Sequence, residues 1–316
     1  MGGVAGKFGV TGLACCMALA LAGCTLVAPP APAPAPDQKA ETAPPARPDS
    51  APSAVAAHFA ATEARRIAQG LLRMERAPRD LPISASLIER AFVEVALRDE
   101  YQIGADRILQ QSSPAALRRW EAPVRLSLEF GASVPAATRE RDSGMVARFA
   151  ARLSRVSEHP IAVTNGRGNF TVLVLSEDER RAIAPRLRAL VPGIDAASQA
   201  LVEDLPLSVS CLVLAFSRDG TNTYSDAVAI IRAELPERTR DMCYFEEITQ
   251  GLGLANDSPV ARPSLFNDSA EFAVMTVLDE QLLRVLYDPR LRPGMREAQA
   301  RPIVRMIAAE LMGGQS

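Results

Sequence analysis

The chain has 316 residues, of which 48% are hydrophobic and 23% are charged, and its formal net charge is −2 at pH 7. A chain so close to neutrality lacks the basic surface with which proteins bind nucleic acid, so we expect no nucleic-acid partner. The part predicted to fold is long enough for one sizeable hydrophobic core.

Residues 1–23 have the features of a signal peptide. One early cation, Lys7, precedes the apolar run VTGLACCMALALAGC, which is too short for a permanent transmembrane helix. The run ends in LAGC, which resembles a bacterial lipobox, so Cys24 is the expected lipidation site and membrane lipid an expected partner. Thr25 follows in place of an aspartate, which favours the periplasmic face of the outer membrane. The alternative is a plain secreted protein.

A tether is expected over residues 24–53. This segment contains APPAPAPAPDQKAETAPPARPDSAPS, which is too rich in proline and alanine to bury a core. Such a composition is typical of a semi-rigid spacer with polyproline character. A role as a proline-rich ligand would need basic or aromatic anchors, and the segment has no such pattern.

The cysteines indicate one disulfide. Of the five, Cys15 and Cys16 would leave with the signal peptide and Cys24 would carry lipid, which leaves Cys211 and Cys243. Two cysteines in an oxidising periplasm suggest a bond between them. It would join a strand to a helix and contribute on the order of 3 kcal/mol in the chain-entropy model.

The remaining chain divides into a first helix, residues 54–78, and one α+β domain, residues 79–316. Helical spacing predicts the first helix and a second one in LPISASLIERAFVEVALRDEY, capped by Ser84 or Ser86. Alternation in APVRLSLEFGASV predicts a half-buried strand, and ATRERDSGMVARFAARLSRVSEH returns to helical spacing. PIAVTN and NFTVLVL are short strand candidates, and Ser176 with Glu179 predicts a capping box for the next helix.

A hairpin and a helix follow. CLVLAFS and YSDAVAIIRAEL are strand-like and are separated by RDGTNT, whose Asp219-Gly220 pair predicts a turn. The helix RDMCYFEEITQGLGL comes next, with Asp241 as the expected N-cap and Gly253 placed to end it in a left-handed conformation. The helices LDEQLLRVLYDPRL and EAQARPIVRMIAAELM come last. This order predicts an α+β fold with a mixed or antiparallel sheet.

The stretch EEITQGLGLAND has the spacing of a zinc-protease helix, HExxHxxGxxHD, without its histidines. Such an enzyme needs two histidines four residues apart, a glutamate as general base, and a glycine turn that brings a third histidine. The sequence keeps three positions and replaces the histidines: Glu247, Gly253 and Asp257 are kept, whereas Glu246, Gln250 and Asn256 stand at the ligand positions.

The surroundings resemble the same clan. A strand hairpin precedes the helix, as the edge strand does in metzincins, and FAVMTVLDEQLLRVLYDP is similar to their methionine turn and following helix, with Met275 in the turn. This resemblance covers residues 211–289. It implies a zincin-like mixed sheet packed with helices.

A second resemblance covers about residues 79–311. The stretches PISASLIERA, CYFEEITQGLGLANDSP, ARPSLFND, EFAVMT and LLRVLYDPRLRPGM are similar to the uncharacterised proteobacterial lipoprotein family called domain of unknown function 2927. The family brings no known activity. The resemblance therefore implies membership of this family and leaves the function open.

The chain has only two histidines, His58 and His159, so it cannot form a three-histidine zinc site, and we expect no metal and no cofactor. Each histidine fits a surface or core position better than a ligand position. An oxygen-ligand site is the alternative: Glu246 and Gln250 share a helix face, and the turn could bring Asn256 or Asp257 alongside to bind calcium or magnesium. The competing interpretation is structural, with acidic residues complementing the helix dipole and Gln250 bonding the chain after the turn.

Paired carboxylates offer a further possibility. Glu246 and Glu247 point about 100° apart on a helix and cannot flank one bond by themselves. Glu247 could pair with a second carboxylate if the loops converge: Asp257, Asp268 or Asp279. The loop NDSPVARPSLFND is either the rim of a cleft or a tight structural loop, since its Asn and Asp residues are typical turn formers.

Two functions stay open. The leading hypothesis is a noncatalytic binding or scaffolding domain of the cell envelope, with a protease-derived cleft for a peptide, an envelope protein or a cell-wall polymer. Its lining would include Glu246, Gln250, Asn256, Asp257, Asn267 and Asp268. The alternative is a peptidase-like hydrolase with Glu247 as general base and a hard cation or a second carboxylate in place of zinc. An enzyme needs its polar groups to converge in an open cleft.

Overall fold

The computed structural model describes residues 53–103, 108–217, 220–267 and 269–313. The predicted signal peptide, the predicted lipidation site Cys24 and nearly all of the predicted tether therefore lie outside the described residues, as do Asp219 and Asp268. Within the described ranges, no helix is both long and apolar enough to cross a membrane.

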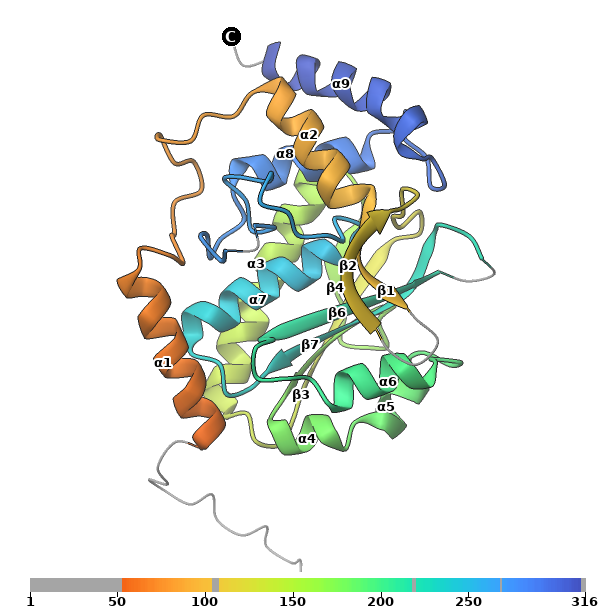
Figure 1. Ribbon diagram of the computed structural model, residues 1–316. Helices are drawn as coiled ribbons and strands as arrows, with labels where there is room; N and C mark the ends of the chain where they lie inside the picture. Colours follow the sequence, from red (N-terminus) through yellow and green to blue (C-terminus); the bar gives the residue numbers. More distant parts are fainter. Residues whose placement is uncertain (1–52, 104–107, 218–219, 268, 314–316) are drawn as a thin grey trace, which may run out of the picture. The chain divides into compact units, whose positions relative to one another are not determined.

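Five strands of the described chain form a mixed sheet at the centre of the fold (Figure 1). They lie in the order β4-β3-β5-β7-β6, with the bounds β3 Val124–Phe130, β4 Ile161–Val163, β5 Phe170–Leu175, β6 Cys211–Ser217 and β7 Tyr224–Arg232. β3 is parallel to β4 and β5, and β5 is parallel to β7, whereas β6 runs antiparallel to β7 at the edge. The predicted α+β fold with a mixed sheet is confirmed.

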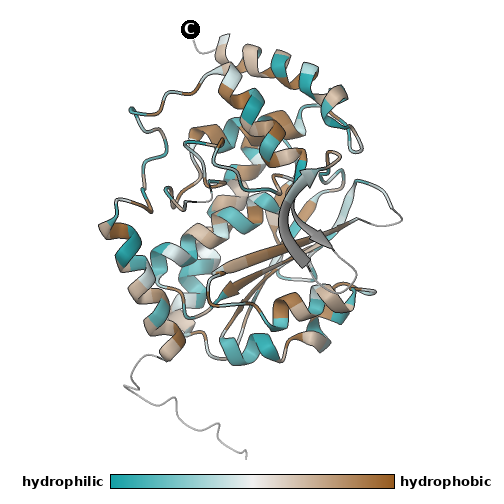
Figure 2. Cartoon of the chain, viewed as in Figure 1, coloured by the Kyte–Doolittle hydropathy of each residue, from teal (hydrophilic) through white to brown (hydrophobic). Residues whose placement is uncertain are grey.

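Both faces of the sheet are covered. Every residue of β5 is buried, and its side chains alternate between two hydrophobic cores: Phe170, Val172 and Val174 face the larger core, and Leu173 and Leu175 face the smaller one. This alternation follows from the two-residue period of a strand. Strands buried on both faces are continuously apolar. Figure 2 shows β6 and β7 as largely hydrophobic ribbons, although β6, at the edge of the sheet, is only partly buried.

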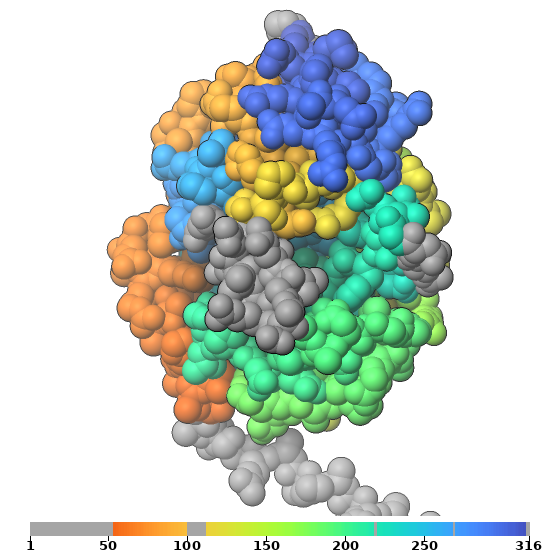
Figure 3. All heavy atoms as spheres, turned by 45° about the vertical axis from the view of Figure 1, so that its right-hand side comes forward, coloured from red at the N-terminus to blue at the C-terminus, as the bar shows by residue number. Residues whose placement is uncertain are grey.

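Helices form the layers on the two faces. The larger core packs against α2 (Ala85–Ala96), α3 (Ala136–Ser157), α7 (Glu237–Gln250), α8 (Val277–Tyr287) and α9 (Glu297–Gly313). The smaller core lies under α4 (Glu177–Arg181), α5 (Ala184–Leu190) and α6 (Ala196–Glu203). Figure 3 shows α9 in blue above the residues that follow β2 in yellow, with α4 to α6 in green below them.

Several helix boundaries were predicted correctly. Ser84 caps α2 by accepting a hydrogen bond from the Leu87 N–H, and Ser176 with Glu179 forms the expected capping box of α4. The expected single helix after Ser176 is nevertheless two, because α4 ends at Arg181 and α5 begins with its own proline in the first turn. Helix α6 was not predicted.

Two expectations at the start of the domain were wrong. Helix α1 (Ala54–Ala68) ends ten residues before position 78, because the chain turns through positive φ angles at Gly70 and Leu72. The second helix was expected to continue to Tyr101, but the chain there forms a separate antiparallel hairpin of β1 (Arg98–Ile103) and β2 (Ile108–Pro114). The strand conformation of this polar run depends on its pairing, which a local pattern does not contain.

Helix α7 begins earlier than the sequence suggested. Its N-cap is Pro236, and the expected cap, Asp241, lies inside the helix and pairs with Arg141. The missing capping acceptor comes from another helix. Glu63 of α1 accepts hydrogen bonds from the Thr239 N–H at 2.9 Å and from the Thr239 hydroxyl at 2.7 Å. A carboxylate at this end also complements the helix dipole.

The turn after α7 depends on glycine. Gly253 has φ +126°, and a Cβ atom there would lie 2.3 Å from the carbonyl oxygen of Arg118. Two carbonyls just before this glycine are held from outside: Trp120 Nε1 donates to Gly251 O at 2.8 Å, and the Tyr287 hydroxyl donates to Leu252 O at 3.0 Å. The helix end is therefore buried but satisfied.

We predict that Gly253→Ala lowers the free energy of unfolding by more than about 3 kcal/mol, since it combines backbone strain with a clash against backbone. Gly193→Ala is the matched control, because Gly193 also has a positive φ (+88°) but a Cβ atom there would meet nothing within 4 Å. The control should cost only about 1–2 kcal/mol. Urea denaturation of both variants measures the difference, and equal losses would contradict the tight packing of this turn.

Candidate functional site

A cleft of about 750 Å³ lies between the edge strand β6 and helix α7. Residues 211–215 of β6 form one wall, and residues of α7 and of the loop that follows it form the other. Helix α6, Tyr224 of β7 and residues at the base of the β1–β2 hairpin complete the lining. This volume lies in the range typical of ligand sites.

Most of the residues that the sequence singled out line this cleft: Glu246, Glu247, Gln250, Asp257 and Asn267. Glu247 is only 4% exposed, whereas Glu246 and Asp257 are partly exposed. The three carboxylates come from one helix and from the loop that folds back after its glycine turn. All three line the same cleft, and the turn brings Asp257 to it.

Three amides of the set have structural hydrogen bonds. Gln250 Nε2 donates to Asp257 Oδ1 at 2.9 Å, which joins α7 to the loop after the turn. Asn256 is 2% exposed and faces the other way, because its Nδ2 donates to Glu94 O at 2.8 Å. Asn267 donates from Nδ2 to Ala261 O at 3.2 Å and so closes its own loop. These contacts match the structural alternative for the loop.

Asp279 lies away from the cleft and caps helix α8. It is fully buried, and its Oδ2 accepts hydrogen bonds from Thr276 N at 2.7 Å and Leu265 N at 3.2 Å. Burial raises the pKa of Asp279 to about 6, although these hydrogen bonds oppose the shift. Asp279 therefore holds the loop before α8 and is too enclosed to act with Glu247.

The predicted disulfide is present between Cys211 and Cys243, with their Cα atoms 5.9 Å apart. It fastens the first residue of β6 to α7 beside the cleft. Cys211 Sγ and one oxygen each of Glu246 and Glu247 lie within 4.8 Å of one another. In the disulfide the sulfur is no thiolate, so the two carboxylates are the anionic groups that this cluster offers.

The histidines take no part in the cleft lining among the described residues. His58 is exposed on α1, and His159 packs against Tyr287 with ring centres 4.7 Å apart. Burial lowers the pKa of His159, and its Nε2 lies 3.0 Å from Ala122 O. Both places agree with the expectation of surface and core histidines.

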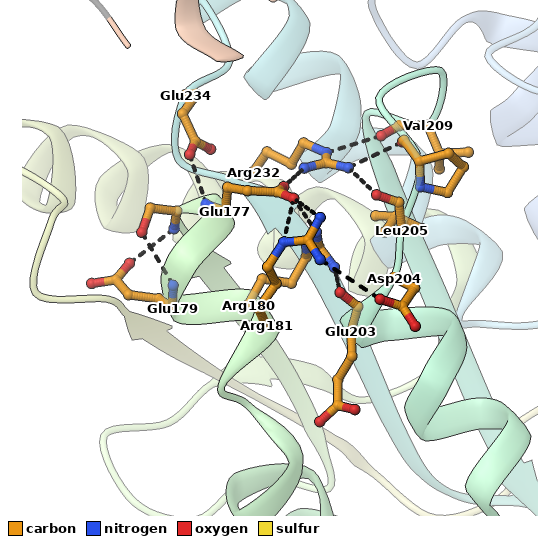
Figure 4. Close-up of polar contacts among 12 residues, drawn as sticks. Glu177, Glu179, Arg180, Arg181, Glu203, Asp204, Leu205, Val209, Arg232 and Glu234 are labelled. Carbon is orange, nitrogen blue, oxygen red and sulfur yellow. Dashed lines mark hydrogen bonds and ion pairs between the residues drawn. The ribbon is translucent and has the colours of Figure 1, made fainter. Parts of the chain in front are cut away.

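A buried charge cluster supports the wall of the cleft next to α6 (Figure 4). Arg232, at the end of β7, is fully buried and donates to Leu205 O at 2.7 Å, Pro206 O at 3.0 Å and Val209 O at 3.0 Å. These carbonyls belong to the segment that leads into Ser208 to Ser210 of the cleft wall. Sequence reasoning missed this cluster, because an arginine inside an apolar strand does not reveal its partners.

Glu177 supplies the negative charge of the cluster. Its carboxylate binds the guanidinium groups of Arg180 and Arg232, both of which are fully buried. Burial by itself raises the pKa of Glu177, but the contacts with the two arginines outweigh it and lower the pKa to about 2. The carboxylate thus stays charged at any physiological pH.

We predict that Glu177→Gln lowers the free energy of unfolding at pH 7 by about 3 kcal/mol, because it leaves two buried cations without their anion. The folded-state pKa of about 2 lies below the ordinary 4.5, so the stabilisation is present above pH 4.5 and is lost as the pH falls from 4.5 towards 2. The difference between wild type and variant should shrink over the same window.

Glu129→Gln is the control, since it removes an exposed ion pair with Arg186 and should cost less than about 1 kcal/mol. Guanidinium denaturation at several pH values measures both variants. A loss in Glu177→Gln no larger than in Glu129→Gln would show that the cluster does not stabilise the cleft wall.

Comparisons with known proteins give a family but no activity. The model of the family described as Protein of unknown function (DUF2927) matches residues 85–306. No curated protein and no solved structure matches the chain, so the zincin-like scaffold stays a prediction. The match includes the edge strand, α7 and the loop that follows it, and it begins with the first residue of α2. The chain belongs to the DUF2927 family of proteins of unknown function.

Proposed function

We propose that this protein is a noncatalytic binding module of the cell envelope, whose cleft holds an extended peptide segment of a partner protein. The observation that carries the proposal is the position of β6, which is both the edge of the sheet and a wall of the cleft. An edge strand presents unpaired N–H and C=O groups, and extended peptides bind such edges as an added strand.

The walls of the cleft suit a peptide in this orientation. The apolar side chains of Val213, Leu214 and Ala215 are partly exposed along β6. The carboxylates of α7 face them across the cleft, and Ser208 and Ser210 add hydroxyl groups at one end. Backbone pairing would supply affinity, and the side-chain contacts would supply selectivity.

The cellular place of this module follows from the N-terminal segment. A lipid on Cys24 and a tether over residues 24–53 would hold the cleft on the periplasmic face of the outer membrane, within reach of envelope proteins. The LAGC sequence supports this location. Incorporation of labelled palmitate into wild type but not into Cys24→Ala, followed by membrane fractionation, checks it. Equal labelling of both would contradict it.

A hydrolase is the second candidate, and one observation favours it. Glu246, Glu247 and Asp257 line the same cleft, and a general acid and a general base need such a shared site. Glu247 would then act as the base, as the spacing EEITQ suggested. The candidate predicts turnover of peptides and the loss of that turnover in Glu247→Gln.

We predict that peptides selected from a random phage-displayed library bind the purified protein through β6. Val213→Lys should weaken their binding more than about tenfold, because the new side chain fills the cleft beside the edge strand. Val163→Lys is the matched control on β4, at the opposite edge of the sheet. Fluorescence polarisation with the selected peptides compares the two variants.

Three outcomes decide between the candidates. N-methylation at alternate peptide residues should abolish binding if the peptide adds as a strand. A library that yields no binder, or peptides that bind wild type and Val213→Lys equally, would overturn the binding module. Cleavage of the same peptides by wild type but not by Glu247→Gln would establish the hydrolase instead.

A further inference from the structure

The disulfide and two carboxylates form one cluster at the wall of the cleft. Cys243, Glu246 and Glu247 lie three and four residues apart on α7 and therefore share a stretch of its surface. Cys211 reaches this surface from β6 through the disulfide. The result is a sulfur atom and two carboxylate oxygens within 4.8 Å of one another, contributed by two different elements.

The two cysteines differ in accessibility. Cys211 lines the cleft and is 9% exposed, whereas Cys243 is fully buried. A reductant that enters the cleft therefore approaches the bond from the side of Cys211.

We propose that reduction of the Cys211–Cys243 disulfide creates a binding site for a thiophilic divalent cation such as Zn²⁺, with Cys211, Glu246 and Glu247 as its ligands. This inference does not depend on peptide binding. The reduced protein would bind the cation at this cluster, whereas the oxidised protein would not.

A dithiol can supply the two electrons that reduction of the disulfide requires. A thiolate of the dithiol attacks the sulfur of Cys211, the disulfide bond breaks, and Cys243 leaves as a thiolate that takes up a proton. The second thiol of the reductant then attacks the mixed disulfide and releases Cys211. The dithiol becomes a disulfide and has delivered two electrons, and the protein holds two thiols.

The released ligands suit such a cation. Zn²⁺ binds thiolate sulfur at about 2.3 Å and carboxylate oxygen at about 2.0–2.2 Å, which places ligand atoms roughly 3–4 Å apart. The present spacing needs only small side-chain rotations once Cys211 is free. Two neighbouring carboxylates favour the protonated thiol, so the cation would displace that proton as it binds. Three protein ligands leave one coordination position open towards the cleft.

A matched pair of variants tests the assignment. Cys243→Ser and Cys211→Ser both lose the disulfide, each keeps one of its two cysteines, and the two variants have the same N-terminal segment. We titrate both variants with Cd²⁺, a spectroscopic substitute for Zn²⁺, and follow the ultraviolet sulfur-to-metal charge-transfer band. Cys243→Ser should bind one more equivalent of Cd²⁺ per protein than Cys211→Ser before the band saturates. Adding Glu246→Gln or Glu247→Gln to Cys243→Ser should weaken this binding more than about tenfold.

The proposal would be overturned if the two cysteine variants bound the same number of Cd²⁺ equivalents. It would also be overturned if the glutamine substitutions left the charge-transfer band unchanged. Circular dichroism establishes that the variants fold. If they do not, wild type and Glu246→Gln are reduced with dithiothreitol, freed of it by gel filtration without air, and titrated in the same way. Identical Cd²⁺ affinities in these two reduced proteins would also refute the site.

Discussion

Helix α7 is held near its start, at its middle and at its end by other segments, and the cleft depends on this attachment. Glu63 of α1 caps its first turn, the Cys211–Cys243 disulfide joins its middle to the edge strand, and Trp120 holds the carbonyl of Gly251 at its end. These contacts come from segments far apart in the chain. Together they set the distance between α7 and β6, which is the width of the cleft.

Buried charges complete this framework. Asp142 of α3 is fully buried and accepts hydrogen bonds from Arg240 Nε at 2.9 Å and from the Tyr244 hydroxyl at 3.0 Å, so it holds α7 to its neighbouring helix. Arg232 holds the wall next to α6 in a similar way. Buried ion pairs add little net stability compared with apolar packing, but a missing partner is strongly destabilising. Such pairs therefore allow only one arrangement of the elements around the cleft.

The role of the cleft carboxylates separates the two proposed functions. The family assignment covers the elements that carry them but brings no activity. A binding cleft and a hydrolytic cleft would share the edge strand and the acidic wall, since a peptide must be held in either case. What separates them is whether Glu247 moves a proton. The spacing of EEITQGLGLAND is compatible with both, and the antiparallel edge strand beside it favours an extended ligand.

The sequence by itself determined the features that depend on local physics. Alternating and continuous apolar runs identified the strands of the central sheet, and Ser176 with Glu179 identified a capping box. LAGC suggested an oxidising compartment, so Cys211 and Cys243, the two remaining cysteines, were expected to form a disulfide. Gly253 was recognised as a position of positive φ because few other residues adopt one, although α7 itself ends at Gln250 with Gly251 as its C-cap.

Only the tertiary structure decided the features that depend on distant partners. The start of α7 was misplaced because its cap is Glu63 of another helix, and the β1–β2 hairpin was missed because its polar strands form through pairing with each other. The same reason separates the candidate residues. Asp257 lines the cleft, whereas Asn256 donates a hydrogen bond to α2 and Asp279 is buried in the first turn of α8. The three residue types are similar, and the direction of each side chain was set by the segment packed against it.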